Sequence, residues 1–167
     1  MTSRRPGLMA TVDLRRAHDD DLPVLWALFQ AAVHRLTSAH YTAAQQVAWA
    51  PAGAPPAAWL ARVRANAPWV ARRSETIVGF ADLQADGRVD MFFVAPEAAG
   101  TGVGRALMQR LIAQANDRGL VAMHADVSLT AEPFFRHFGF RVIARHTVIR
   151  RGVSLRNARM ALSLGTS

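Results

Sequence analysis

The chain has 167 residues, of which 51% are hydrophobic, with a formal net charge of +8 at pH 7 and no cysteine. This length and apolar content suit one domain with a substantial core. The lack of cysteine excludes disulfides, thiol catalysis and cysteine metal sites. No apolar run is long enough to cross a bilayer and no signal peptide is recognised, so we expect a cytoplasmic protein without a membrane partner.

All 20 basic residues are arginine, and they occur singly or in pairs instead of in one dense run. Nucleic-acid-binding surfaces usually gather their basic residues on one face or stripe. A solvated basic surface that also attracts anionic ligands is therefore the favoured interpretation, and we expect no nucleic acid as a partner.

The first part of the chain predicts one strand followed by three helices. Residues 11–17 read as a strand, and Asp19 or Asp20 is expected to cap a helix that ends near residue 37. A second helix begins near Thr42 and is broken by "APAGAPP", and a third covers "PAAWLARVRAN". We expect residues 1–10 to be an N-terminal extension of a single domain.

After the third helix the apolar pattern changes from a helical to a strand-like period. The runs "WVARRS", "TIVGFADLQ" and "RVDMFFVA" indicate an antiparallel meander. A glycine-rich loop, a helix over 103–118, a strand in "LVAMHADV", a short helix in "TAEPFFRHF" and a hairpin that turns at Arg151-Gly152 follow. The order predicts an α/β domain over 11–165, with a mixed, mainly antiparallel, twisted sheet and helices on both faces.

The loop "VAPEAAGTGVGRALMQRL" has Gly100, Gly102 and Gly104 at every second position, where a strand ends and a helix begins. Free backbone N–H groups and the helix dipole favour an anion at such a place. Residues without side chains would let a pyrophosphate lie against those groups. G-x-G-x-G alone is a weak signal, and a flexible strand-to-helix connection is the alternative.

Asp90 is a carboxylate in an otherwise apolar strand, where it shares a face with Phe92 and Val94. Burial would raise its pKa, which would suit a general base that acts directly or through water, or a site that binds an amine. An ion pair with a nearby arginine is the alternative.

The next strand places His124, Asp126 and Ser128 on one face. Residues two apart on a strand point in parallel, so these three are not expected to converge as a Ser-His-Asp triad. Asp126 and Ser128, nearest the strand's end, are expected to reach a bound substrate. The histidines and acids show no metal-ligand spacing, and we predict no metal.

Tyr41, Gln45 and Trp49 recur every four residues on one face of the predicted second helix. Either they pack against the sheet, or they form a wall of a substrate pocket in which Gln45 supplies a hydrogen bond to the substrate. Tyr41 is the only tyrosine of the chain, and it joins Asp90 and Ser128 as a catalytic candidate.

The stretch "MFFVAPEAAGTGVGRALMQRL", followed by "AEPFFRHFGF", resembles the GNAT superfamily of acetyl-CoA-dependent N-acetyltransferases. "HYTAAQQVAWAP" and "RRGVSLRNARMAL" are similar to a YafP-like bacterial branch. The resemblance implies direct transfer of an acetyl group from acetyl-CoA to a primary amine of a small molecule or peptide, in a ternary complex. It also implies a homodimer as one arrangement, with the last hairpin as a candidate interface. The alternative is a catalytically silent module that binds or senses acyl-CoA.

The resemblance further implies that the strand ahead of the loop splays from the next strand and that acetyl-CoA lies in the gap. The expected cofactor-binding residues are Phe92, Phe93, Val94, Gly100, Thr101, Gly102, Val103, Gly104, Arg105, Phe134 and Phe135. The expected acceptor-binding residues are Gln45, Trp49 and Asp126. This chain departs from the family pattern at Ala99, where a glutamine or arginine is usual, and at Phe135, where a tyrosine often serves as the acid.

Overall fold

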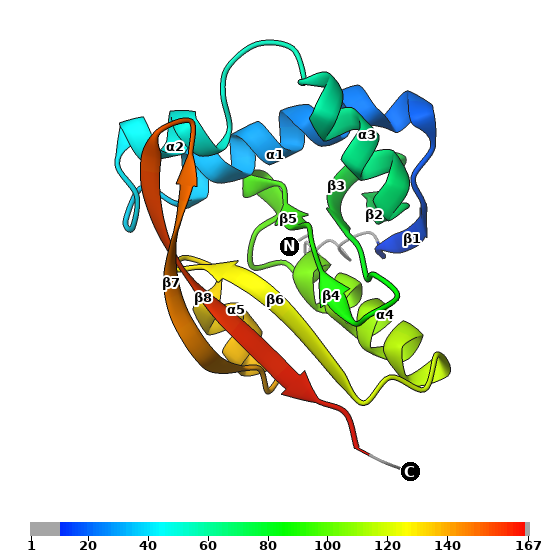
Figure 1. The fold of residues 1–167 in the computed structure, drawn as a ribbon. Helices are drawn as coiled ribbons and strands as arrows, with labels where there is room; N and C mark the ends of the chain where they lie inside the picture. Colours follow the sequence, from blue (N-terminus) through cyan, green and yellow to red (C-terminus); the bar gives the residue numbers. More distant parts are fainter. Residues whose placement is uncertain (1–10, 166–167) are drawn as a thin grey trace, which may run out of the picture.

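The computed structural model describes residues 11–165, and the expected N-terminal extension lies outside the described residues. The strands are β1 (Asp13–Arg16), β2 (Trp69–Arg73), β3 (Thr76–Ala81), β4 (Arg88–Val89), β5 (Phe92–Val94), β6 (Ala122–Ser128), β7 (Arg141–Arg150) and β8 (Val153–Ser163). The helices are α1 (Leu22–Leu36), α2 (Ala43–Trp49), α3 (Ala57–Asn66), α4 (Val103–Asp117) and α5 (Glu132–His137). The predicted order of elements is confirmed, except that one predicted strand forms both β4 and β5 (Figure 1).

The strands form two four-stranded sheets, in the orders β1-β2-β3-β5 and β4-β6-β8-β7. The first sheet is antiparallel throughout, and the second contains one parallel pair, β4 with β6. The predicted strand "RVDMFFVA" is divided between them, because β4 pairs with β6 whereas β5 pairs with β3. The mixed, mainly antiparallel α/β class is thus confirmed, with the sheet divided within this strand.

The carboxylate of Asp82 holds the chain at the point where β4 and β5 part. It accepts hydrogen bonds from the backbone N–H groups of Asp90 and Met91, both at 3.0 Å. The side-chain amides of Gln84 and Asn66 donate to the same carboxylate at 2.8 and 3.2 Å. Asp82 is fully buried, so these four donors take the place of water.

Helices α1 and α4 cover opposite faces of the first sheet. Phe80 of β3 packs beside Phe93 of β5, and Phe93 meets Phe29 of α1 with ring centroids 4.9 Å apart. Gly79 faces the other way, because a Cβ there would lie 2.9 Å from Val103 of α4. Successive strand residues point to opposite faces, so the prediction of helices on both faces is confirmed.

Helix α1 begins differently from the prediction. Asp19–Asp21 form a 3-10 turn, and α1 follows at Leu22. The capping role expected of Asp19 or Asp20 was wrong, because Asp21 is the aspartate that is engaged there. It accepts from the backbone N–H of His18 at 2.7 Å and pairs with Arg15 of β1 at 2.7 Å.

The hairpin of β7 and β8 turns at Arg151 and Gly152, as predicted, with φ of 48° and 77°. Its tip lies beside α2 (Figure 1). Gln45 of α2 donates to the carbonyl oxygen of Ser154 at 3.0 Å, and Arg151 donates to that of Ala48 at 2.8 Å. The hairpin is therefore joined to the helical layer at its far end.

Burial raises the pKa of Asp82 to about 6, from an ordinary value of 3.8. As the pH rises from 4 to 6, the unfolded chain loses this proton first. The contribution of Asp82 to the free energy of unfolding should therefore fall by about 2 kcal/mol across that window. A carboxyl-carbon NMR titration should show Asp82 titrating near the upper end of it.

The control is Asp82→Asn, which has no titrating proton there and cannot accept both backbone N–H groups with equivalent oxygens. Unfolding by urea at several pH values should give a wild-type-minus-variant difference that decreases between pH 4 and 6. A difference that is independent of pH would contradict the raised pKa.

Candidate functional site

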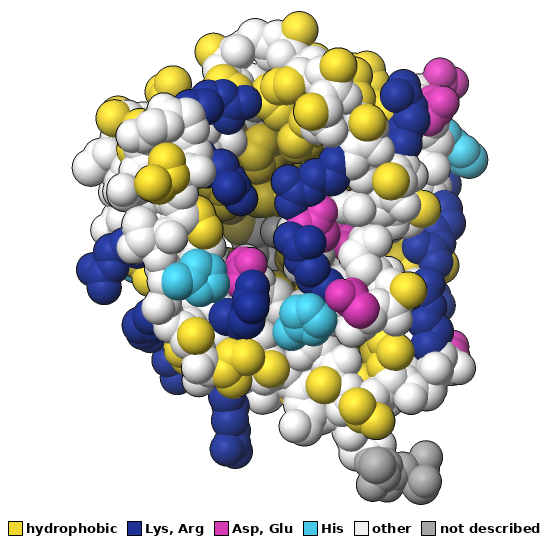
Figure 2. Space-filling view, in the orientation of Figure 1, with side chains coloured by type: hydrophobic (Ala, Val, Ile, Leu, Met, Phe, Trp, Pro, Cys, Tyr) yellow, Lys and Arg dark blue, Asp and Glu magenta, His cyan; other side chains and the backbone are white. Residues whose placement is uncertain are grey.

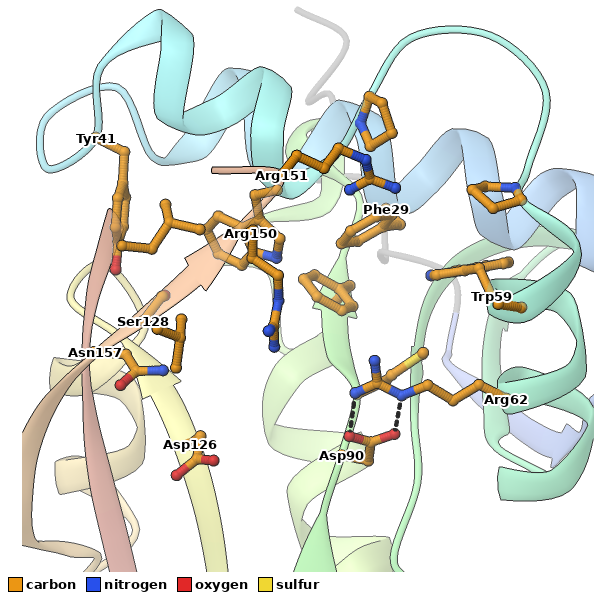
Figure 3. Close-up of a pocket in the computed structure, with 18 of the residues that line it drawn as sticks. Phe29, Tyr41, Trp59, Arg62, Asp90, Asp126, Ser128, Arg150, Arg151 and Asn157 are labelled. Carbon is orange, nitrogen blue, oxygen red and sulfur yellow. Dashed lines mark hydrogen bonds and ion pairs between the residues drawn. The ribbon is translucent and has the colours of Figure 1, made fainter. Parts of the chain in front are cut away.

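Two adjoining cavities lie where β5 and β6 diverge. The larger, of about 600 Å³, passes the glycine loop and is named the cleft. The smaller, of about 370 Å³, is bordered by α1, α2, α3 and the tip of the β7–β8 hairpin and is named the pocket (Figure 3). The residues that line both form the junction: Trp49, Val89, Asp90, Phe93, Asp126 and Ser128.

The cleft follows the free edge of β5, which is the edge strand of the first sheet. Ala95, just after this strand, donates its backbone N–H to Val78 at 2.8 Å. Because backbone groups alternate in direction along an antiparallel strand, Val94 and Phe92 turn their N–H and C=O groups toward the open side. An extended chain with amide groups can bond to such an edge as an added strand.

The three glycines of the loop have two different structural roles. Gly100 and Gly102 have φ of 72° and 96°, and a Cβ on either would meet no atom within 4 Å. They allow left-handed turns and leave open the space beside the start of α4. Gly104 lies inside α4, where a Cβ would lie 3.0 Å from the ring of Phe134. It lets α4 approach α5 closely.

Arg73, at the end of β2, fixes the glycine loop in place. Its guanidinium donates to the hydroxyl and to the carbonyl oxygen of Thr101, both at 2.5 Å. The Thr101 hydroxyl also donates to the carbonyl oxygen of Ala98 at 2.5 Å. The side chain of Thr101 holds the loop and does not line the cleft, and its predicted contact with the cofactor stays a prediction.

The N-terminus of α4 supplies backbone donors next to this loop. The first residues of a helix, here from Val103 to Arg105, have N–H groups without an intrahelical acceptor. The side chain of Val103 is buried, so only its backbone is available. Arg105 lines the cleft, as do Phe134 and Phe135. The two phenylalanine rings pack on Phe92 at centroid distances of 5.2 and 5.7 Å.

Asp90 lies in the junction with its carboxylate largely enclosed by partners. Arg62 binds it through two nitrogens, Arg88 donates at 3.0 Å and Asn66 at 2.7 Å. Burial alone would raise the pKa of Asp90, but the hydrogen bonds from Arg62 and Asn66 outweigh burial and hold that pKa below its usual value. The predicted raised pKa was therefore wrong, and the alternative, an ion pair with arginine, is what the structure shows.

Asp126 is the more accessible of the two carboxylates at the junction. Its side chain is 30% exposed, compared with 5% for Asp90. Arg159 donates to it at 3.0 Å, and Nε2 of His146 lies 3.7 Å away. Ser128, two residues further along β6, accepts from the backbone N–H of Ala131 at 3.1 Å. Within residues 11–165 the Ser128 hydroxyl donates to no acceptor.

The predicted stripe of Tyr41, Gln45 and Trp49 is divided between two roles. Tyr41 and Trp49 line the pocket with ring centroids 5.5 Å apart. Gln45 lines neither cavity, and its predicted contact with the acceptor stays a prediction. As the third residue of α2, it accepts from the backbone N–H of Thr42 at 2.8 Å while it donates to β8.

The Tyr41 hydroxyl is engaged on both sides. It donates to the carbonyl oxygen of Arg156 at 2.6 Å and accepts from the backbone N–H of Leu129 at 2.9 Å. Burial raises the pKa of Tyr41, so the hydroxyl keeps its proton at neutral pH. Tyr41 thus connects α2 with the ends of β6 and β8, beside the junction.

The cationic side of the pocket was not predicted from the sequence. Five arginines line it: Arg62, Arg88, Arg150, Arg151 and Arg156. Figure 2 shows dark blue side chains around a hollow whose floor is hydrophobic. Arg62 and Arg88 are far in the sequence from the three arginines of the hairpin and meet them only through the fold. Only the Arg150-Arg151 pair at the predicted hairpin turn was a local signal.

Within residues 11–165, no group of three or more His, Cys, Asp or Glu side chains is arranged to hold a metal ion. The described helices also include none long and apolar enough to cross a membrane.

Comparison with known proteins gives a consistent result. Residues 37–163 match the family described as acetyltransferase (GNAT) domain. The chain is 32% identical over 149 residues to "Uncharacterized N-acetyltransferase YafP" of Escherichia coli K12, covering 89% of this chain and 94% of that protein.

Solved structures agree. A GCN5-related N-acetyltransferase from Rhodopseudomonas palustris is similar at a TM-score of 0.89 and 34% identity, covering 95% of this chain and 99% of that one. The putative acetyltransferase yncA of Salmonella typhimurium, solved with acetyl-CoA, shares the fold at a TM-score of 0.69 and 23% identity, with 95% and 96% covered.

Replacing Arg73 by glutamine should loosen the glycine loop, because both bonds to Thr101 are lost. We expect the free energy of unfolding to fall by about 1–3 kcal/mol, and the amide hydrogens of residues 99–102 to exchange faster. Arg72→Gln is the matched control, since the exposed Asp13 is the one partner of Arg72 within the described residues. Equal exchange rates in the two variants would contradict this role of Arg73.

Proposed function

We propose that this chain, which belongs to the GNAT family of acetyl-CoA-dependent N-acetyltransferases, transfers the acetyl group directly to the primary amine of a small acceptor in a ternary complex. The observation that carries the proposal is the junction. There, a cleft with an open strand edge and a free helix N-terminus meets a separate pocket of small-molecule size. A homodimer built through the last hairpin stays a prediction.

The cleft fits the three chemical parts of acetyl-CoA. Gly100, Gly102 and the first N–H groups of α4 would hold the pyrophosphate, with Arg105 adding positive charge. The free backbone groups of Phe92 and Val94 would bond the amides of the pantetheine arm. The thioester supplies the activated acetyl group when the donor is bound. Backbone groups do most of this binding, so Ala99, in place of a longer polar residue, leaves the anion site intact.

Asp126 is assigned to the acceptor amine. An amine attacks only after it has lost a proton, so a carboxylate within reach of the junction is needed, directly or through water. Asp126 is partly exposed there, whereas Asp90 has its oxygens occupied by Arg62, Arg88 and Asn66. We therefore assign Asp90 to holding Arg62 and Arg88 in place, and no longer to proton removal.

We assign Ser128 and Tyr41 to the part of the junction where the CoA thiolate would leave. Ser128 has a hydroxyl proton without an acceptor in the part of the chain that the structure describes, and it lines both cavities. Tyr41 bonds to Leu129, the next residue along, and fixes the end of β6. Phe135 carries no proton to donate, and a thiolate is a good leaving group, so a hydrogen bond from Ser128 suffices.

The second candidate is a silent module that binds or senses acyl-CoA. Phe135, where a tyrosine would supply an acid, favours it. Steady release of thiol from acetyl-CoA in the presence of an amine would exclude this candidate. Binding of acetyl-CoA without turnover, across a panel of primary amines, would support it.

Gly102→Glu should abolish binding of acetyl-CoA. The new carboxylate would stand in the open space beside the helix N-terminus and repel the pyrophosphate. We expect calorimetric titration to give a Kd at least about 100-fold higher than that of the wild type. Gly119→Glu is the control, because Gly119 also has positive φ, 68°, with open space around it, at the other end of α4. Unchanged affinity in Gly102→Glu would refute the assignment of the loop.

Asp126→Asn should lower kcat/KM at pH 7 by about 100-fold, because the amide cannot take the proton of the amine. The loss of kcat/KM should become smaller as the pH is raised toward the pKa of the free amine, because solvent then removes the proton of the amine. Asp117→Asn, on the exposed end of α4, is the control. A deficit that stays constant with pH would indicate that Asp126 only positions its neighbours.

A further inference from the structure

We infer that the acceptor is an amine that also carries an oxyanion group, a carboxylate or a phosphate, and that arginines of the β7–β8 hairpin bind this group. The inference rests on the proposed function, since it names the chemical class of the molecule that enters the pocket.

The charges of the pocket are unequal. Five arginines line it, against two aspartates. Asp90 is paired with Arg62 and Arg88, and Asp126 is paired with Arg159, which lies outside the pocket lining. Neither carboxylate therefore neutralises the arginines of the hairpin.

Three arginines remain: Arg150, Arg151 and Arg156. In the described part of the chain none of them forms an ion pair, and Arg150 and Arg156 donate no side-chain hydrogen bond. Arg151 uses one nitrogen on the carbonyl oxygen of Ala48. In Figure 3 the guanidinium groups of Arg150 and Arg151 project from the hairpin into the pocket. Guanidinium groups so placed match the paired oxygens of a carboxylate or phosphate.

The opposite wall of the pocket is aromatic. Trp26, Phe29 and Trp59 from α1 and α3 form one cluster, with ring centroids 4.9–5.8 Å apart. Figure 3 shows Phe29 and Trp59 across the pocket from the hairpin. A ligand between these walls would place an apolar body against the rings and its anionic group against the arginines. A volume of about 370 Å³ suits a molecule the size of an amino acid or a short peptide end.

The two ends of the pocket orient such a ligand. Asp126 lies at the junction, whereas Arg151 lies at the hairpin turn, beside α2 (Figure 3). An ammonium group is attracted to Asp126 and an oxyanion to the arginines. The amine is thereby directed toward the thioester, and the reversed orientation is opposed at both ends.

The test compares amines that differ only in the anionic group: phenylalanine with 2-phenylethylamine, tryptophan with tryptamine, and O-phosphoethanolamine with ethanolamine. Thiol release is measured with saturating acetyl-CoA. We expect kcat/KM to be at least about 10-fold higher for the anionic member of the carboxylate pairs, of the phosphate pair, or of both. The carboxylate pairs and the phosphate pair thus show which of the two oxyanion groups the pocket binds. Equal or higher values in all pairs for the members that lack the anionic group would overturn the inference while leaving the acetyltransferase assignment intact.

Variants test whether the hairpin arginines are responsible. The double variant Arg150→Gln/Arg156→Gln should reduce the ratio within the preferred pair by about 10-fold or more. Arg141→Gln is the matched control, because Arg141 is exposed on the same strand and lines neither cavity. An unchanged ratio in the double variant, or an equal reduction in the control, would contradict the assignment to the hairpin.

A binding measurement separates failure of this inference from failure of the proposed function. N-acetylphenylalanine and N-(2-phenylethyl)acetamide are titrated into the protein with CoA present, which requires no turnover. Tighter binding of the carboxylated compound, lost in the double variant, would support the oxyanion site even if no amine were acetylated. Equal affinities for both compounds would reject it.

Discussion

The hydrogen bonds from the backbone N–H groups of Asp90 and Met91 to the buried Asp82 are the contacts on which the site depends. These donors lie where the chain leaves one sheet for the other, so the regular ladder is interrupted around them. Buried backbone donors must be paired, and Asp82 pairs them without closing the gap between β5 and β6. Asn66 then bridges Asp82 to Asp90, and Asp90 holds Arg62 and Arg88. One network thus reaches from the opening of the sheet to the cationic side of the pocket.

The cleft and the pocket use different kinds of recognition. The cleft offers mainly backbone groups, at the edge of β5 and at the start of α4, with glycines that keep side chains away. Such a surface suits a ligand with repeated amides and phosphates. The pocket offers side chains, arginine on one side and aromatic rings on the other. The two meet at a few residues, which allows one part of the protein to hold a common donor while the other selects an acceptor.

The features that the sequence predicted correctly are those that depend on local patterns. Strand and helix order and the hairpin turn at Arg151-Gly152 follow from residue type and spacing. The state of Asp90 could not be predicted, because its partner Arg62 is 28 residues away and is brought to it by the packing of α3. Gln45 has the helical spacing of a pocket residue, yet its place in the first turn of α2 commits it to a cap. The meeting of Arg62 and Arg88 with the arginines of the hairpin likewise depends on tertiary structure.

The attachment of the hairpin has a consequence for how such a protein diversifies. The side chains of Tyr41 and Gln45 donate hydrogen bonds to the backbone carbonyl oxygens of Arg156 and Ser154 in β8. The side chains of Arg156 and Ser154 take no part in these bonds. A carbonyl oxygen is present whatever residue occupies the position. Mutations at Arg156, which lines the pocket, therefore change what the hairpin offers to a ligand while both anchors persist. Gene duplicates with another side chain at this position would acquire new acceptors without first losing the fold. The hairpin can therefore vary in evolution while the acetyl-transfer site stays constant.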